Sequence, residues 1–579
     1  MGAPADAGAT IYDAALSRRQ ALMGASGARA LVKNFRVFSL AAFACIGGVL
    51  YGYNQGMFSG VLAMPSFKQH MGEYDPFDSN ASQTKKGWLT AILELGAWFG
   101  TLFSGFLAET ISRKYGIIVA CCIFILGVVV QACAIDAGPN AILAGRFITY
   151  ALYKETSRLI YDCADLQFRS GSSGVKTANN LASEVRGALV ALQQFAICFG
   201  IMVSFWIDYG TNYIGGTNVG EQSEAAWLVP VCLQLAPCLV LLGGMIFMPF
   251  SPRWLVHHNR EDEAKEILST LRGLPTNHEL LQLEFLEIKA QSLFEKRSIA
   301  EQFPRLREQT VWNNFKLQFV AIKSLFQKKS MLKRCAISGV TMFFQQWTGI
   351  NAVLYYAPTI FQQLGQTDNT VSLLATGVVG IAMLVATAPA VLWVDRIGRK
   401  PVLITGAIGM ATCHIIIAIL FARNSDSWPE HRAAGWAAVA MVWLFVVHFG
   451  YSWGPCAWII IAEIWPLSSR PYGVSLGASS NWMNNFIIGQ VTPDMLQGIT
   501  YGTYILFGII TYLGAAFVYL FVPETKRLTL EEMDIIFGSE GIVRADFERM
   551  EEINNEIGLT AMVYRAPYEA ATVEAEKAA

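Results

Sequence analysis

Residues 371–400 read VSLLATGVVGIAMLVATAPAVLWVDRIGRK. The stretch before Asp395 carries no charge, and it is longer than the roughly 20 apolar residues that a helix needs to cross a bilayer. It then ends abruptly in the charged motif DRIGRK (395–400). We interpret the stretch as a transmembrane helix that is followed directly by a charged loop.

The composition of the whole chain agrees with this interpretation. Of 579 residues, 53% are hydrophobic and 15% are charged, whereas soluble proteins carry about a quarter charged residues. A net charge of −1 gives no basic footprint for nucleic acid. The sequence offers no nucleophile set, metal motif or phosphate loop. It therefore predicts an all-α polytopic membrane protein that is not an enzyme and has no cofactor.

Ten further apolar runs resemble the one at 371–394, so eleven spans are clear. They lie near 36–58, 88–108, 116–134, 187–207, 227–248, 335–361, 371–394, 401–422, 436–461, 474–493 and 501–522. A twelfth span is expected between 141 and 183, where only AILAGRFITYALY (141–153) is apolar enough to begin it.

The chain also repeats itself, which divides it into two halves. Glu109-x-x-Ser-Arg113-Lys after the second span matches Asp395-x-x-Gly-Arg399-Lys after the eighth, and PFSPR (249–253) matches PETKR (523–527). Two six-helix halves in the same sense are typical of one large transporter architecture. The expected boundaries are a tail at 1–35, halves at 36–250 and 335–523, a middle loop with amphipathic helices at 251–334, and a tail at 524–579.

The distribution of Lys and Arg predicts the orientation. Both residue types follow the second and eighth spans, and both are absent from 208–226 and 362–370. Because cytoplasmic loops are enriched in Lys and Arg, we expect both termini and the middle loop to be cytoplasmic.

Ten short motifs follow one another in order along the spans and loops. They are GYNQG (52–56), SRKYG (112–116), GRF (145–147), VRGALVALQQ (185–194), SPRWL (251–255), FFQQWTGINAVLYYAP (343–358), DRIGRK (395–400), GPCAWIIIAEIWPLSSR (454–470), SNWMNNF (480–486) and PETK (523–526). In these motifs the chain resembles the sugar porters of the major facilitator superfamily, and it is most similar to fungal high-affinity glucose and monosaccharide transporters. The resemblance implies a monomer in the plasma membrane that carries a sugar by alternating access. Its expected partners are the sugar, protons and the lipid bilayer.

A sugar site needs side chains that both donate and accept hydrogen bonds, beside aromatic surface. In the seventh span Gln345, Gln346, Asn351 and Tyr355 supply these groups, and Gly349 interrupts the helix, as in transporter binding sites. The resemblance adds to this site Gln194, Trp458, Asn481 and Asn485. The alternative is that these amides only join helices to one another.

The resemblance also implies a set of gating charges that bridge the halves in one state and separate in the other. This set comprises Glu109, Arg113, Arg186, Asp395, Arg399, Glu463 and Arg470. The family's Glu seven residues before Arg186 is Asn179 here, which weakens the set in the first half. The alternative is plain anchoring by positive charge on the inner side.

Proton coupling has evidence on both sides. Proton-coupled members carry an Asp that pairs with the Arg of GRF, and here Asn54 replaces that Asp while Arg146 is kept. Asn cannot titrate, which favours a facilitative uniporter. However, Glu94 lies in the second span, where a carboxylate is costly and indicates function, and burial favours its neutral form. It could instead pair with Arg146 or hydrogen-bond within the bundle. We favour proton symport through Glu94.

Residues 150–183, YALYKETSRLIYDCADLQFRSGSSGVKTANNLAS, replace the expected fourth span with polar sequence. Charged residues at the centre of a membrane helix cost roughly 2.5–3.5 kcal/mol each. Three interpretations remain open: a misread gene structure, an inactive splice form, or a working variant whose short fourth helix lies at 141–161. A non-transporting sugar sensor is the alternative of another class.

Overall fold

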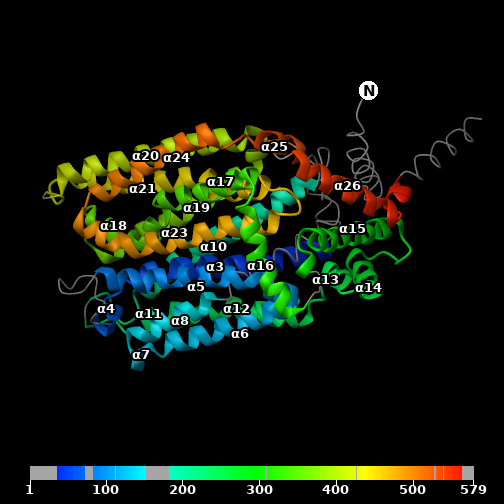
Figure 1. The fold of residues 1–579 in the computed structure, drawn as a ribbon. Coiled ribbons are helices and arrows are strands. Elements are labelled where there is room, and N and C mark those ends of the chain that lie inside the picture. The colour runs from blue at the N-terminus through cyan, green and yellow to red at the C-terminus, as the bar shows by residue number, and fades with distance from the viewer. Residues whose placement is uncertain are drawn as a thin grey trace, which may run out of the picture.

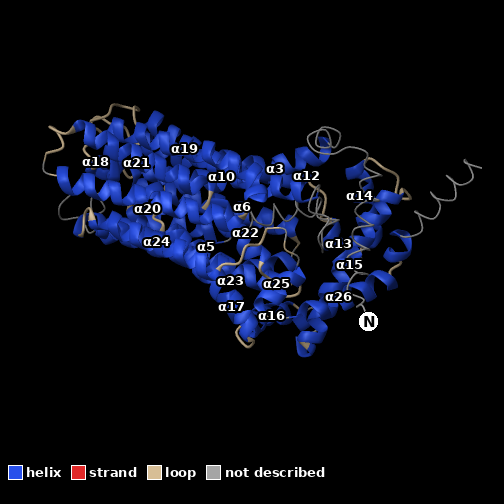
Figure 2. Cartoon of the chain, turned by 90° about the horizontal axis from the view of Figure 1, so that it is seen from above, coloured by secondary structure: helices blue, strands red, loops and turns tan. Residues whose placement is uncertain are grey.

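The computed structural model describes residues 35–71, 83–110, 112–151, 182–218, 220–306, 310–425, 427–526, 528, 530–538 and 540–563. In these residues the secondary structure is helical, with no strand. The long helices run side by side along one direction in both views (Figures 1 and 2). This confirms the predicted all-α class.

The first half of the chain forms one group of helices. Its long members are α3 (Phe35–Val61), α5 (Gln83–Thr110), α6 (Arg113–Ala132), α8 (Pro139–Ala151), α10 (Ala182–Thr211), α11 (Ala225–Leu233) and α12 (Leu235–Phe247). Two short helices, α4 (Pro65–Met71) and α7 (Ala134–Ala137), connect them. A proline within α11, Pro230, precedes the break at Gln234 that separates α11 from α12.

The second half forms the other group. It contains α17 (Lys329–Trp347), α18 (Ile350–Gln363), α19 (Asn369–Ile397), α20 (Arg399–Asn424), α21 (Arg432–Tyr451), α22 (Trp453–Glu463), α23 (Arg470–Gly498) and α24 (Gly502–Phe521). The halves meet along two seams, α10 against α19 and α5 against α23. These seams place residues of the first half beside the broken helix α17–α18.

The expected fourth span is described only in its first part. Helix α8 has 13 residues, which is roughly 20 Å of helix and shorter than a bilayer core. The following residues, 152–181, lie outside the described part of the chain. A fourth crossing at 141–161 therefore stays a prediction.

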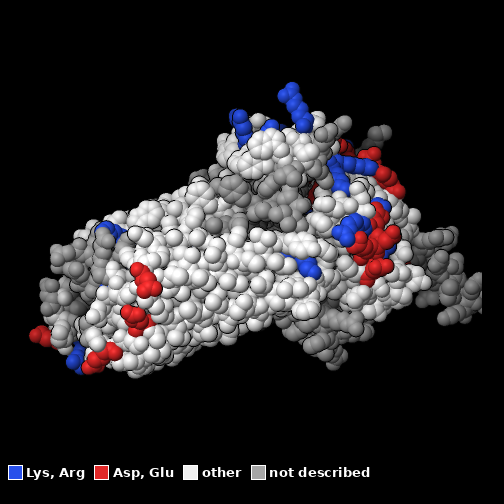
Figure 3. All heavy atoms as spheres, turned by 90° about the horizontal axis from the view of Figure 1, so that it is seen from below, with Lys and Arg blue, Asp and Glu red and all other residues white. Residues whose placement is uncertain are grey.

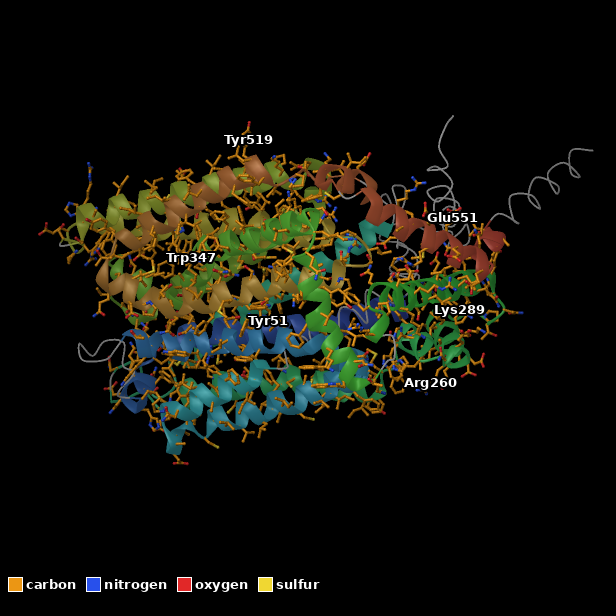
Figure 4. All side chains as sticks on the ribbon, viewed as in Figure 1. Tyr51, Arg260, Lys289, Trp347, Tyr519 and Glu551 are labelled. Atoms are coloured by element: carbon orange, nitrogen blue, oxygen red, sulfur yellow. The ribbon has the colours of Figure 1, made fainter. Side chains whose placement is uncertain are left out.

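The outer surface fits a bilayer. In the described residues, six stretches are long and apolar enough to cross a membrane: Lys114–Ala132, Ala225–Phe247, Asn369–Pro389, Arg399–Asn424, Arg432–Glu463 and Gly502–Phe521. Most of the broad middle of the face in Figure 3 carries neither Lys and Arg nor Asp and Glu, which gather towards the two ends. In Figure 4, Tyr519 of α24 points outward from the opposite side of the bundle.

The middle segment forms a helical layer at one end of the bundle. It contains α13 (Pro252–His257), α14 (Glu261–Arg272), α15 (Glu279–Gln302), the short 3₁₀ helix η2 (Pro304–Leu306) and α16 (Val311–Leu325). The last helices, α25 (Leu530–Phe537) and α26 (Glu540–Glu556), join it, and α26 lies along α15 (Figure 1). We call this the domain end, and the opposite end, with α4 and α7, the far end.

Helices α3 and α10 pack closely through glycines. A Cβ at Gly52 would lie 2.0 Å from Ile197 O, and one at Gly56 would lie 2.2 Å from Ser204 Oγ. Only glycine fits such a backbone approach. The contact continues to Gly60, where the neighbour is Asp208.

Candidate functional site

The break between α17 and α18 positions the candidate site. Gly349 adopts a φ of +88°, a conformation that favours glycine, and helix α18 restarts at Ile350. A second irregularity follows at Tyr356 (φ −123°, ψ 20°), two residues before Pro358. Residues 345 and 346 thus end one helix, while Asn351 and Tyr355 begin the next, as the sequence indicated.

Five buried amide side chains meet at this break, and we call them the amide set. The Asn481 Nδ2 donates to Gln345 Oε1, whose Nε2 donates to the Trp453 carbonyl at 2.9 Å. In the second branch, Asn351 Nδ2 donates to Gln346 Oε1 and Gln55 Nε2 donates to Asn351 Oδ1 at 3.0 Å. The members are Gln55, Gln345, Gln346, Asn351 and Asn481. The Gln55–Asn351 bond joins the two halves.

Tyr355 connects the same break to a carboxylate. Its hydroxyl lies 2.7 Å from Glu94 Oε1 on α5 and 3.1 Å from Asn485 Oδ1 on α23. A tyrosine hydroxyl has one proton to donate, so it serves one of these acceptors at a time. A change at Glu94 therefore changes what Tyr355 offers to Asn485, which lies one turn from Asn481.

Aromatic rings lie beside the amides. The Trp482 ring centroid is 6.2 Å from that of Trp458 and 6.4 Å from that of Tyr51, with an edge-on arrangement in the second pair. Figure 4 labels Tyr51 and Trp347 over the middle of the bundle; Tyr51 is buried and Trp347 is half-buried. The predicted Trp458 thus belongs to an aromatic group that spans both halves.

The structure brings most predicted substrate residues together, with Gln194 as the exception. Its Nε2 donates to Cys198 Sγ in the same helix at 3.8 Å, and the structure gives it no bond to the amide set. Sequence reasoning missed Gln55 and Trp482. Both lie in motifs already quoted, GYNQG and SNWMNNF. For Gln55, the available signal was an amide side chain within an apolar helix.

The proton-coupling candidates separate into different environments. The second oxygen of Glu94, Oε2, is buried without a hydrogen-bond partner among the described residues. Arg146 lies over the Phe58 ring at 3.9 Å and donates to the Thr90 carbonyl at 3.4 Å. No Glu94–Arg146 ion pair occurs in the described part. Of the two alternatives for Glu94, an ion pair with Arg146 or a hydrogen bond within the bundle, the structure shows the hydrogen bond.

The replacement residue Asn54 has its own partner. Its Nδ2 donates to Gln234 Oε1, at the break between α11 and α12. Asn54 is therefore held by the sixth span, and the structure gives no hydrogen bond between Asn54 and Arg146. The family's pairing of these two positions is absent among the described residues.

One gating pair is present at the domain end. Arg399 Nη2 bonds Glu463 Oε1 at 3.0 Å, and Arg470 Nη2 donates to the Trp465 carbonyl at 3.3 Å. The side chains of Glu109, Arg113, Arg186 and Asp395 lie outside the described part.

Sequence reasoning missed Glu524 of PETK. Its carboxylate accepts from the backbone N–H groups of Arg399 and Lys400, both at 3.0 Å. A negative charge at a helix N-terminus is stabilising, so Glu524 caps α20 and fixes the gating motif. Within the described residues no cluster of His, Cys, Asp and Glu could hold a metal ion.

The chain matches a known protein family over most of its length. The family model described as sugar (and other) transporter matches residues 40–149 and 177–537. The unmatched gap, 150–176, coincides with the polar stretch that replaces the expected fourth span.

Named relatives cover almost the whole chain. The chain is 29% identical to the "MFS-type transporter qa-x" of Neurospora crassa over 533 residues, which are 90% of this chain and 92% of the relative. It is 30% identical over 521 residues to a "probable quinate permease" of Aspergillus fumigatus, covering 89% of this chain and 90% of the relative.

Solved structures share the fold. The proton:xylose symporter XylE bound to 6-bromo-6-deoxy-D-glucose superposes with a TM-score of 0.65 at 24% identity, over 86% of this chain and 99% of XylE. An inward-open form of XylE from E. coli gives 0.66 at 23% identity, with 86% and 99% coverage. At this identity the likeness supports the major facilitator fold alone.

Proposed function

Because the chain belongs to the sugar (and other) transporter family of the major facilitator superfamily, we propose that it carries a monosaccharide, most simply a hexose, by alternating access. The observation that carries this proposal is the amide set at the broken helix α17–α18. Its members donate and accept, they are buried, and they join both halves. Sugar hydroxyls can take the place of these mutual bonds one by one.

The aromatic group supports the same proposal. Trp458, Trp482 and Tyr51 lie next to the amides and present flat apolar surface. A sugar ring has two such faces, so amides at its rim and rings on its face match its chemistry. We propose that Gln345, Gln346, Asn351, Tyr355, Asn481 and Asn485 bind hydroxyls, with Gln194 reaching them in another state of the cycle.

We propose that transport is coupled to protons through Glu94. Protonation of Glu94 removes its need for the Tyr355 hydrogen, which frees that hydrogen for Asn485 or for a substrate hydroxyl. The carboxyl and the substrate site thus compete for one donor. This competition links proton binding to sugar binding. A uniporter, which Asn54 favours, would lack this link.

A hydroxy acid is the second candidate substrate. Several relatives that span some 90% of the chain are named quinate permeases, and quinate shares with a hexose a ring that bears several hydroxyls but adds a carboxylate. Buried Arg146, whose Nε and Nη1 have no hydrogen-bond partner among the described residues, could accept that group. Competition between glucose and quinate for uptake separates the two.

Reconstituted vesicles test the proposal. Radiolabelled glucose should accumulate when a proton gradient is imposed and should leak out when a protonophore is added. Glu94→Gln should abolish accumulation but retain exchange of labelled for unlabelled sugar. Accumulation by Glu94→Gln equal to that of the native protein would refute coupling through this residue. An absence of any flux would favour the sugar-sensor alternative or an inactive product.

A further inference from the structure

The spans contain a second buried carboxyl group, Asp208 on α10. It is fully buried, and neither of its oxygens has a hydrogen-bond partner among the described residues. The sequence motifs gave it no role. A charged carboxylate in such a place is costly, and an intramembrane carboxyl indicates function by default.

The surroundings of Asp208 are uncharged. A Cβ built on Gly60 of α3 would lie 2.4 Å from Asp208 Oδ2, so the carboxyl lies directly against the α3 backbone. The backbone donor that faces the carboxyl is the Gly60 N–H, and the carboxyl shares this donor with the α3 helix. The titratable neighbours are Tyr53 of α3, whose hydroxyl donates to the Pro230 carbonyl, and Cys232 of α11 beside it. No charged group of α19, the third helix packed on α10, acts on Asp208 within the described residues.

This environment differs from that of Glu94. Glu94 accepts a hydrogen bond from Tyr355 and lies near the positive charge of Arg146. Asp208 has neither a side-chain donor nor a cation. Two carboxyl groups in such different environments are suited to different roles. Here the environment of Asp208 suits only the neutral acid.

Polar side chains close the far end one turn beyond Asp208. Asn212 Oδ1 accepts from Gln222 Nε2 at 3.1 Å and from Asn369 Nδ2 of α19 at 3.3 Å. Gln222 Oε1 in turn accepts from the Ser66 N–H at 2.9 Å and from its hydroxyl. We call Ser66, Asn212, Gln222 and Asn369 the far-end bridge. The Asn212–Asn369 bond joins the two halves, so it must break when the far end opens.

We propose that Asp208 binds a proton from the far side and that the far end closes only when this proton is bound. When the bridge opens, water reaches the carboxyl one turn below and the group ionises freely. Closing then seals it in an environment without a side-chain donor or a cation, which favours the neutral form. Acid on the far side thus favours closure, and alkali holds the far end open.

This role deepens the proposed transport function and rests on it. It differs from coupling through Glu94 in one respect. A proton that binds and leaves Asp208 on the same side regulates the cycle without being carried across. Loss of Asp208 should therefore change the pH dependence of exchange, whereas loss of Glu94 should change accumulation.

The test uses exchange of labelled for unlabelled glucose in vesicles with the same pH on both sides. Between about pH 5.5 and about pH 8, native exchange should slow by roughly tenfold, because the ionised form resists closure. Asp208→Asn resembles the protonated acid, and its exchange should change by only about twofold. A superimposable pH profile for the two proteins would overturn the proposal.

Asp368→Asn is the matched control. Asp368 is exposed at the same end and its Oδ1 caps the Thr370 N–H at 2.8 Å, so this variant should keep the native pH profile. A second measurement does not depend on transport. The melting temperature of purified native protein should fall by about 3 °C more than that of Asp208→Asn as the pH rises over the same range. Equal falls would contradict the inference, whether or not the protein transports glucose.

Discussion

The amide set inside the bundle and the contacts of α26 at the domain end hold the chain together by opposite means. In the amide set, neutral groups bond one another and are almost fully buried. On α26, Arg549 pairs with Glu301 and Asp546, and Glu556 pairs with Arg297. Met550 and Ile553 pack against Ala290 and Phe294 of α15. We call the contacts of α26 with α15 the C-terminal clasp.

The difference follows from where water can reach. A buried charge that loses its partner is strongly destabilising, whereas an amide can change partners without leaving a charge unpaired. Groups that must exchange bonds during transport are therefore neutral. At the domain end water compensates the charges, so ion pairs can join segments far apart in sequence. The clasp should thus affect stability and the amide set should affect transport.

Asn351→Ala should give the largest effect and should leave the clasp untouched. It removes the bonds to Gln346 and Gln55, each worth about 1–1.5 kcal/mol, so glucose uptake should fall by about 10- to 100-fold. The measurement is kcat/KM in vesicles. Asn484→Ala is the control, because Asn484 bonds Trp347 rather than the amide set. Uptake by Asn351→Ala at the native rate would contradict the proposal that Asn351 is central to the amide set.

Arg549→Ala should loosen the clasp with little effect on transport. It leaves Glu301 and the mostly buried Asp546 without their cation and should cost about 1–3 kcal/mol of local stability. Limited proteolysis or amide exchange in residues 540–556 measures this change. Arg544→Ala should cost at most about 0.5 kcal/mol, because its pair with Glu548 is exposed. Equal protection in both variants would show that the ion pairs contribute nothing.

Gly349→Ala should damage the break that positions the amide set. A side chain at φ +88° is strained, and its Cβ would lie 3.0 Å from Phe507, so we expect a loss of about 1–2 kcal/mol. Gly339→Ala in α17 has open space around it and should stabilise by about 0.5–1 kcal/mol. Melting temperatures compare the two, and a stabilising Gly349→Ala would contradict the strain argument.

Acid should weaken the domain end through His257. Burial lowers the pKa of His257 to about 4, below the unfolded value of about 6.5. The unfolded chain therefore binds more protons between these values, and stability is complete above about pH 6.5 and is lost as the pH falls towards 4. We expect a loss on the order of 1 kcal/mol. In His257→Gln this slope should shrink, as measured by amide exchange in α13 and α15.

His258→Gln is the control for that experiment. His258 is exposed and stacks on Trp254, and it is a minor contributor to the lowered pKa of His257, so its replacement should reduce the slope much less than His257→Gln does. Burial raises the pKa of Asp546 at the same end of the bundle. This gives stability a pH dependence of the opposite sign, because the contribution of Asp546 is lost as the pH rises. An unchanged slope in His257→Gln would assign the acid sensitivity to other groups.

The fold could be predicted because its signals are local. The apolar runs and the repeat around Asp395 and Arg399 predicted the class and the two halves, the quoted motifs indicated the family, and Gly349 indicated the broken helix. The partners of the polar residues could not be predicted in the same way. Nothing in the sequence joins Tyr355 to Glu94, or Asn54 to Gln234, because these pairs depend on how helices turn against one another.

Asp208 was missed for a related reason. The predicted fifth span ended at residue 207, so the sequence indicated that Asp208 belongs to the following loop. Its burial depends on the close approach of Gly60 from another helix, which the sequence does not show. The gating charges were predicted from motifs alone. Of these, the described side chains give one pair, Arg399–Glu463, and one cap from Glu524 that the motif did not indicate.

The position of α26 in the sequence affects how the protein is made. Its partner surface on α15, at Ala290 and Phe294, is synthesised some 250 residues before Met550 and Ile553. Until Met550 and Ile553 leave the ribosome, Ala290 and Phe294 lack these apolar partners, and exposed apolar surface of this kind is what chaperones bind. A product that stops before Met550 would leave Phe294 without these partners, so the absence of the clasp would make that product a target of cellular quality control.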